Sequence, residues 1–148
     1  MSKDRVSAGF IAGIIAGIAM NIVDWIGFGL GLYTELLLNW GAVAIYGRLP
    51  LNIYEVVFAQ FAQIMFSGFV GIIFAFLIQK LTSKNYLIKG WIFGVAAWFG
   101  LYALSIAIRL PTLETHEFNA VFSHFITSLI YGIVLALVLN RIDKKVRP

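Results

Sequence analysis

Polar side chains that could bind a ligand interrupt three strongly apolar segments of this chain. They occur in pairs at helical spacing: Asn21 with Asp24, Gln60 with Gln63, and His124 with Ser128. Spacings of three or four residues place the two members of each pair on one helix face. Polar groups within such apolar segments usually face a protein interior or a water-filled cavity. These six residues are therefore the candidate binding site for a small ligand, an ion or a protein partner.

The two histidines also allow a divalent metal site. Its ligands would be His116, Glu117 and His124, with Asp24 or Glu114 as a fourth. Imidazole and carboxylate groups suit zinc or another divalent ion. However, His116 and His124 lie eight residues apart, and no compact His-x-x-x-His or Glu-x-x-His pair occurs. In the other interpretation His124 hydrogen-bonds Gln63 or a backbone carbonyl, and the sequence predicts no cofactor.

Asp24 admits two interpretations. Near the outer end of its helix, its carboxylate could be hydrated or paired with Arg48 or Arg109. Alternatively, it lies in a cavity of low dielectric constant, where it could bind a cation or a proton. No Gly-x-Ser-x-Gly motif, phosphate-binding loop or pair of intramembrane carboxylates accompanies it. The sequence therefore favours a protein that is not an enzyme.

Four apolar stretches must position these residues. They run from Val6 to Val23, Val56 to Ile78, Gly90 to Ile108, and Asn119 to Leu139. None contains a charged residue, and each is close to the ~20 residues that a helix needs to cross a ~30 Å hydrocarbon layer. We expect helices at about 6–28, 54–80, 88–108 and 118–141. The predicted fold is an all-α membrane protein, a four-transmembrane-helix bundle that forms one domain over residues 1–148.

The composition of the chain supports a membrane protein. Of its 148 residues, 61% are hydrophobic and 12% are charged, whereas soluble domains have about 25% charged residues. The absence of cysteine excludes disulfides and thiolate ligands. The basic residues lie in the tails and in one loop rather than on a polar face, so the predicted partner is the lipid bilayer and not a nucleic acid.

The distribution of Lys and Arg predicts the orientation in the membrane. One side would hold Lys3, Arg5, Lys80, Lys84, Lys89, Arg141, Lys144, Lys145 and Arg147. The other side would hold Arg48 and Arg109. Because positively charged residues concentrate in cytoplasmic loops, we expect both termini in the cytoplasm.

The orientation places the six polar candidates in the outer half of the membrane. The inner halves of the second and fourth helices are apolar at 72–78 and 133–139. The sequence thus predicts a polar vestibule that opens to the extracytoplasmic side and is sealed at the cytoplasmic end. In the outer segment at about 29–53, the run Thr34–Trp40 suggests a short interfacial helix, and Pro50 should end any helix there.

An internal repeat is indicated by two matching segments. Gly9–Ile14 matches Gly90–Val95, and Gly71–Leu81 matches Gly132–Ile142. In the second register Gln63 pairs with His124, and Ser67 with Ser128. We therefore expect two parallel-repeat helical hairpins, related by an axis along the membrane normal.

Small residues indicate where helices pack closely. Gly9, Gly13 and Gly17 recur every four residues in the first helix, and Gly90 and Gly94 do so in the third. Such rows let another backbone approach closely. They would serve either packing within one bundle, which we favour, or formation of a homodimer.

The second half of the chain resembles four-helix bacterial inner-membrane proteins of the YagU and YqhR type. The resemblance lies in Lys89–Gly94, Pro111 in the outer loop, Phe122–His124, and Asn140–Asp143. It implies a multi-pass protein of the bacterial cytoplasmic membrane and transfers no functional residue. The long first outer segment departs from the resemblance.

The sequence thus favours a non-enzymatic membrane protein that binds a small ligand, an ion or a partner protein in the outer vestibule. Two other classes stay open. One is a small transporter or channel formed by an oligomer, and the other is a metal-dependent membrane enzyme.

Overall fold

The described chain contains five helices. They are α1 (Arg5–Gly29), α2 (Leu38–Tyr46), α3 (Ile53–Lys80), α4 (Tyr86–Ala107) and α5 (Phe118–Lys145). The structure is a computed structural model that describes residues 4–81, 84–109 and 117–145, except for the side chain of residue 145. All regular secondary structure in these residues is helical.

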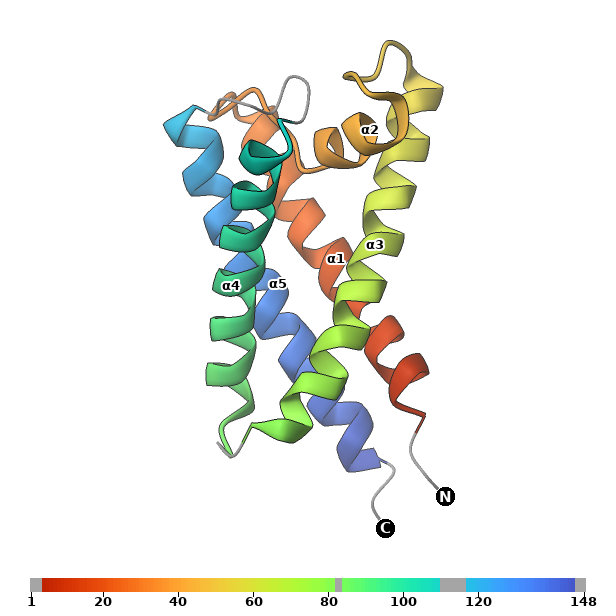
Figure 1. Cartoon of the computed structure of the whole chain (residues 1–148), viewed down its shortest axis with the longest axis vertical. Helices are drawn as coiled ribbons and strands as arrows, with labels where there is room; N and C mark the ends of the chain where they lie inside the picture. Colours follow the sequence, from red (N-terminus) through yellow and green to blue (C-terminus); the bar gives the residue numbers. More distant parts are fainter. Residues whose placement is uncertain (1–3, 82–83, 110–116, 146–148) are drawn as a thin grey trace.

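The helices α1, α3, α4 and α5 are each long and apolar enough to cross a membrane, as predicted. The beginning of α1 and the end of α5 lie at the same end of the bundle, and α2 lies near the opposite end (Figure 1). Large apolar side chains such as Ile11, Phe69 and Ile92 are exposed on the outside of the bundle, as expected for a surface that faces lipid.

Glycines bring α1 and α3 into close contact. A β-carbon at Gly9 would lie 2.8 Å from the carbonyl oxygen of Gly71, and one at Gly71 would lie 2.7 Å from the Cα of Gly13. A β-carbon at Gly17 would lie 2.6 Å from the Cβ of Ser67. The glycine face of α1, which was predicted to serve either packing within the bundle or a homodimer, is thus occupied by α3 of the same chain.

The same kind of contact joins α4 to α5. A β-carbon at Gly90 would lie 2.6 Å from the Cβ of Ala136, and one at Gly132 would lie 3.1 Å from the backbone nitrogen of Gly94. Gly90 and Gly94 on α4 face α5, as Gly9 and Gly13 on α1 face α3. The chain therefore contains two tightly packed helix pairs.

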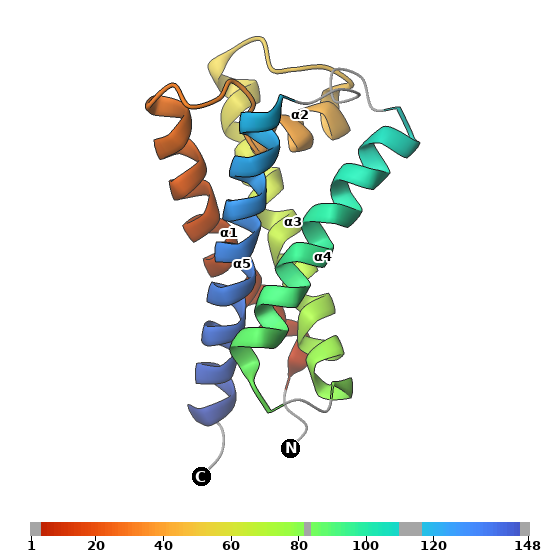
Figure 2. The same ribbon diagram turned by 90° about the vertical axis from the view of Figure 1, so that its left-hand side faces the viewer.

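The two pairs meet mainly through α1 and α5. Their shared core contains Ala12, Ala16, Met20, Tyr131, Leu135 and Leu139. By contrast, α3 and α4 make few direct contacts, and the rings of Phe74 and Phe93 meet with centroids 4.9 Å apart. Towards α2, these two helices diverge (Figures 1 and 2).

Polar contacts fasten the end of the bundle opposite α2. Arg5 donates to Asp143 at 3.0 Å, and the hydroxyl of Tyr86 donates to the same carboxylate at 3.1 Å. The Nζ of Lys89 donates to the carbonyl oxygens of Ile78 and Leu81 at 3.2 and 2.8 Å. Lys89 thereby satisfies carbonyl groups at the end of α3, where a cation also interacts favourably with the helix dipole.

The short outer helix differs from its predicted position. It begins at Leu38 rather than at Thr34, and it ends at Tyr46 before Gly47, whose φ is 69°. The start is later because the backbone nitrogen of Leu37 donates to the carboxylate of Asp24. Residues just before α2 are therefore tied to α1 instead of forming a first helical turn. At Gly41, α2 approaches α3, where a β-carbon would lie 3.0 Å from the carbonyl oxygen of Ala59.

Candidate functional site

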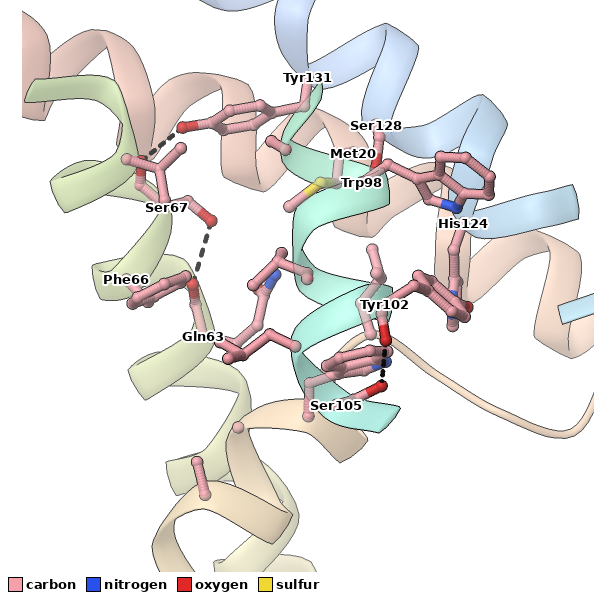
Figure 3. Close-up of a pocket in the computed structure, with 18 of the residues that line it drawn as sticks. Met20, Gln63, Phe66, Ser67, Trp98, Tyr102, Ser105, His124, Ser128 and Tyr131 are labelled. Atoms are coloured by element: carbon pink, nitrogen blue, oxygen red, sulfur yellow. Dashed lines mark hydrogen bonds between the residues drawn. The ribbon is translucent and has the colours of Figure 1, made fainter. Parts of the chain in front are cut away.

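A cavity of about 460 Å³ lies between the diverging helices α3 and α4. Helix α2 covers it with Trp40, Gly41, Ala44 and Ile45, and its back wall includes Met20, His124, Ser128 and Tyr131 from α1 and α5. Its side walls include Gln63, Phe66, Ser67 and Val70 from α3 and Trp98, Leu101, Tyr102 and Ser105 from α4 (Figure 3). Most of these side chains are aliphatic or aromatic, so the lining is mainly apolar.

The edge of the cavity between α3 and α4 is formed by exposed apolar side chains. Phe66 on α3 is 51% exposed, and Leu104 and Ile108 on α4 are 52% and 56% exposed. Because both helices are apolar enough to span a membrane, this edge faces the hydrocarbon region if they do so. The cavity is thus covered by α2 and accessible from the side.

Three amide side chains at the α3 side of the cavity form one cluster, which we call the amide cluster: Asn21, Gln60 and Gln63. The Nδ2 of Asn21 donates to the Oε1 of Gln63 at 2.7 Å, and its Oδ1 accepts from the Nε2 of Gln60 at 2.9 Å. The Nε1 of Trp25 donates to the Oε1 of Gln60 at 2.7 Å. The amide cluster therefore links α1 to α3.

A second group, the Asp24 cluster, consists of Asp24, Tyr33, His124 and Tyr102. Asp24 and His124 are each 1% exposed. The carboxylate of Asp24 accepts from the backbone nitrogen of Leu37 at 2.8 Å and from the hydroxyl of Tyr33 at 3.1 Å. Its Oδ1 also lies 3.6 Å from the Nε2 of His124. The cluster joins α1, α5 and the segment that leads into α2.

The hydrogen bonds of His124 indicate that its Nε2 carries a proton. Its Nε2 lies 3.2 Å from the backbone carbonyl oxygen of Glu35, and its Nδ1 lies 2.6 Å from the hydroxyl of Tyr102. Because a carbonyl oxygen can only accept, Nε2 is the donor in the first contact. The Nδ1 contact with Tyr102 can have either direction, depending on whether Nδ1 also carries a proton. In both cases the two ring nitrogens contact protein groups, so His124 has a structural role in this cluster.

Tyr33 lies outside the long helices and is the donor that reaches Asp24. Burial raises the pKa of its hydroxyl, because removal from water disfavours the phenolate. The hydroxyl also donates to the backbone carbonyl oxygen of Asp24 at 2.6 Å. Tyr33 thus stays protonated and holds the start of the outer segment against α1.

Three polar groups on the cavity wall have no hydrogen-bond partner in the described part of the chain. The Nε2 of Gln63 donates to none of the described residues, and the hydroxyl of Ser128 makes no hydrogen bond with any of them. The Nε1 of Trp98 also lacks an acceptor among these residues, although that atom is buried. The other hydroxyl groups on the wall, those of Ser67, Ser105, Tyr131 and Tyr102, each form a hydrogen bond with a protein group.

The six candidate residues fall into two sets. Gln63, His124 and Ser128 line the cavity. Asn21, Asp24 and Gln60 lie behind its walls and bond other protein groups. The space enclosed by the described residues is therefore mainly apolar and lies under α2, which differs from the polar vestibule open to the outer side that the sequence predicts. The reason is that the polar side chains largely satisfy one another.

The alternative partners of Asp24 and the metal ligands have other positions. Arg48 pairs with Glu55 through contacts of 2.7 and 2.9 Å, not with Asp24. Contact with Glu55 raises the pKa of Arg48. His116 and Glu114 lie outside the described residues, and Glu117 is exposed. Among the residues that the structure describes, no three His, Asp or Glu side chains form a metal-binding group.

Two residues of the site were not predicted from the sequence. Tyr102 lies three residues before Ser105 on α4, and both line the cavity, so polar groups at helical spacing could have indicated it. Tyr33 carries no such signal because it lies outside the long helices. In comparisons with protein-family models, curated proteins and solved structures, no match to this chain was found.

Proposed function

We propose that this protein is a non-enzymatic multi-pass membrane protein that binds a small, mainly apolar molecule in the cavity between α3 and α4. The observation that carries the proposal is an apolar cavity of about 460 Å³, covered by α2 and edged by exposed side chains of two membrane-compatible helices. Its volume is within the range of ~300–1,000 Å³ that is typical of small-molecule sites. A ligand of this kind would enter from the bilayer.

The orientation of the protein in the membrane follows from the positions of its Lys and Arg residues. The end of the bundle opposite α2 carries Arg5, Lys80, Lys84, Lys89, Arg141 and Lys144. By the preference of basic residues for the cytoplasm, that end is cytoplasmic, and the cavity lies in the outer half of the membrane. Together with the resemblance of its second half, this supports a location in the bacterial cytoplasmic membrane.

We also propose that the two helix pairs are copies of one two-helix unit. Gly9 faces Gly71 in one pair, and the matching Gly90 faces Gly132 in the other. Gly13 approaches Ser67, and the matching Gly94 approaches Ser128. The aligned positions therefore make the same contacts, which supports a repeat of structure as well as of sequence.

The closed inner half favours binding over transport. Below the cavity, the glycine contacts join each helix pair, and Phe74 meets Phe93 between α3 and α4. Tyr131 closes part of the back wall, where its hydroxyl donates to the carbonyl oxygen of Ser67 at 2.6 Å. A route across the membrane would require these contacts to separate, whereas binding from the side would not.

The proposal is tested with 1-bromoundecane, a bilayer-soluble quencher of tryptophan fluorescence, in lipid nanodiscs. Trp98 lines the cavity and Trp91 is exposed elsewhere on α4. Variants that keep one of these tryptophans, with the other three changed to phenylalanine, report on each place separately. We expect quenching of Trp98 to saturate as the cavity fills, and quenching of Trp91 to rise without saturation.

Two neighbouring alanines provide the matched controls. Ala97 lines the cavity, whereas Ala96 is exposed and does not. Ala97→Phe should fill the space and remove the saturable quenching of Trp98, while Ala96→Phe should leave it unchanged. Identical, non-saturating curves for Trp98 and Trp91 would show that the cavity binds no such molecule.

A further inference from the structure

We infer that Trp40 on α2 is the positioning residue that holds the cavity open, because its side chain keeps α4 away from α3. The inference rests on the proposed function, since it names the side chain on which the binding cavity depends. It comes from a comparison of two helix contacts in the same bundle, of which one is closed and the other is open.

The contact of α1 with α5 is the closed one. The two helices pack directly against each other. Ala12 and Ala16 on α1 are fully buried and share a core with Leu135 and Leu139 on α5, which are also fully buried. Close packing of this kind is the arrangement that apolar helices reach when nothing lies between them.

The contact of α3 with α4 is closed at one end only. Phe74 and Phe93 meet there with ring centroids 4.9 Å apart, and the two helices then diverge towards α2 (Figures 1 and 2). Nearer to α2, Val70 on α3 and Ala97 and Leu101 on α4 line the cavity. Because packed helices have axes about 8–10 Å apart, the divergence requires an element that keeps α3 and α4 separate.

Helix α2 is that element. At Gly41 it packs on α3, where a β-carbon would lie 3.0 Å from the carbonyl oxygen of Ala59. The preceding residue, Trp40, packs on α4, and the centroid of its ring lies 5.0 Å from that of Tyr102. Two consecutive residues of α2 therefore touch opposite walls of the cavity and span the gap between α3 and α4.

The surface against which Trp40 packs is itself fixed. The hydroxyl of Tyr102 lies 2.6 Å from the Nδ1 of His124 on α5, and the Nε2 of the same ring donates to the carbonyl oxygen of Glu35 at 3.2 Å. Because Glu35 precedes α2 in the chain, these contacts run from α2 through α4 and α5 back to the segment that leads into α2. Trp40 thus packs against a supported wall, as a spacer must.

The size of its side chain distinguishes Trp40 from the other residues by which α2 covers the cavity. Those residues are Gly41, Ala44 and Ile45. An indole is large and rotates about only two side-chain bonds, so it keeps its shape under load from a neighbouring helix. Without it, α4 could approach α3 and gain van der Waals contacts, which drive helix association in lipid. Ala97 and Leu101 would then pack on α3 and close the cavity.

Double electron–electron resonance in lipid nanodiscs tests the inference. The chain contains no cysteine, so two introduced cysteines carry the only spin labels. Val57 on α3 and Ile106 on α4 are exposed near the diverging ends and lie outside the cavity lining. Trp40→Ala should shift the distance between these two labels to shorter values. Labels at Ile73 and Ile92, exposed near the closed end of the contact, should keep their distance.

Two further variants make the measurement specific to the ring. Trp40→Phe is the matched control, because it keeps an aromatic ring, and the outer distance should stay near that of the parent protein. Trp40→Leu removes less volume than Trp40→Ala and should give a smaller shift in the same direction. It replaces Trp40→Ala as the test variant if the alanine protein does not fold.

Fluorescence provides a second measurement. The protein that keeps only Trp98 already contains Trp40→Phe, so its quenching by 1-bromoundecane should saturate. Trp40→Ala in its place should abolish this saturation, because the cavity closes. If Trp40 merely filled part of a larger space, Trp40→Ala would enlarge the cavity. The distance between Val57 and Ile106 would then be unchanged and the quenching would still saturate.

The results distinguish the two proposals. An unchanged outer distance in Trp40→Ala would overturn the role of Trp40, and the proposed binding function would stand as long as quenching of Trp98 saturates. A shorter outer distance in Trp40→Ala, together with non-saturating quenching in the Trp40→Phe protein, would support the role of Trp40 and overturn the binding function.

Discussion

Helices α1 and α4 each pack by glycines against the next long helix, α3 or α5, but their other contacts differ. Helix α1 also packs against α5. By contrast, α4 diverges from α3 between the contact of Phe74 with Phe93 and the end of the bundle near α2. The first pair also carries α2 in its long connection, residues 30–52. The cavity thus lies where α3 and α4 do not contact each other, and it is covered by α2, which only the first pair carries.

The largest expected effect comes from the glycines that make the pairs alike. Gly71→Leu places a branched side chain between α1 and α3, where even a β-carbon lies 2.7 Å from the Cα of Gly13. Because both backbones would have to move, we expect a loss of about 4 kcal/mol or more, above the usual cost of overpacking. Gly132→Leu should cost a similar amount in the other pair. The measurement is unfolding in mixed detergent micelles, followed by circular dichroism.

Gly100 is the control for this experiment. It lies on α4, and a β-carbon there would have no atom within 4 Å. Gly100→Ala should keep or slightly raise stability, because alanine favours a helix by up to ~1 kcal/mol over glycine. If Gly71→Leu is severe and Gly132→Leu is tolerated, the two pairs are not equivalent and the proposed repeat of structure fails.

The next largest effect concerns Asp24, which holds the segment before α2, the helix that only the first pair carries. Asp24→Ala removes the acceptor for the backbone nitrogen of Leu37, whereas the hydroxyl of Tyr33 keeps the backbone carbonyl oxygen of residue 24 as its acceptor. A buried donor without an acceptor costs about 1–3 kcal/mol, so we expect a loss of that size. Hydrogen exchange should rise mainly in α2, since Asp24 fixes the segment before it. Asp24→Asn keeps one acceptor oxygen and should have a smaller effect.

An increase in exchange spread evenly over all five helices would contradict this role of Asp24. It would mean that the carboxylate supports the whole bundle and not the attachment of α2. Saturable quenching of Trp98 by 1-bromoundecane is a second measurement of how firmly α2 is attached. Because α2 covers the cavity with Trp40 and Ala44, we expect weaker binding of this probe in Asp24→Ala than in Asp24→Asn.

The four long helices were predictable because each depends on a local property, an uncharged apolar run of sufficient length. The glycine rows were predictable for the same reason, since their spacing is read along one helix. The start of α2 was not, because it depends on a contact between Asp24 and Leu37, thirteen residues apart. The separation of α3 from α4 has no local signal at all. Spacing therefore identified Gln63 and Ser128 as polar residues on interior faces, but it could not show that the space between them is mainly apolar.

A smaller loss of stability is expected from the ion pair that joins the two helix pairs at the end of the bundle opposite α2. The side chains of Arg5 and Asp143 are 17% and 8% exposed and lie 3.0 Å apart, joining α1 to α5. Asp143→Asn should cost about 1–2 kcal/mol, between the values for exposed and buried ion pairs. Thermal unfolding measures the loss, and exchange should increase at the adjacent ends of α1 and α5. Unchanged exchange there would show that the apolar core alone holds the pairs together.

The smallest effect should come from the ion pair next to the cover of the cavity. Arg48 follows α2 and pairs with Glu55 near the start of α3, so this pair lies within the first helix pair and does not connect the two. Exposed ion pairs contribute little, because water and salt screen the charges and the ordered side chains lose entropy. Glu55→Gln should therefore leave the melting temperature within error and leave probe binding at Trp98 unchanged. A clear loss of binding would mean that this contact, as well as Asp24, holds α2 over the cavity. The difference between the two pairs would then depend on both ends of the connecting segment.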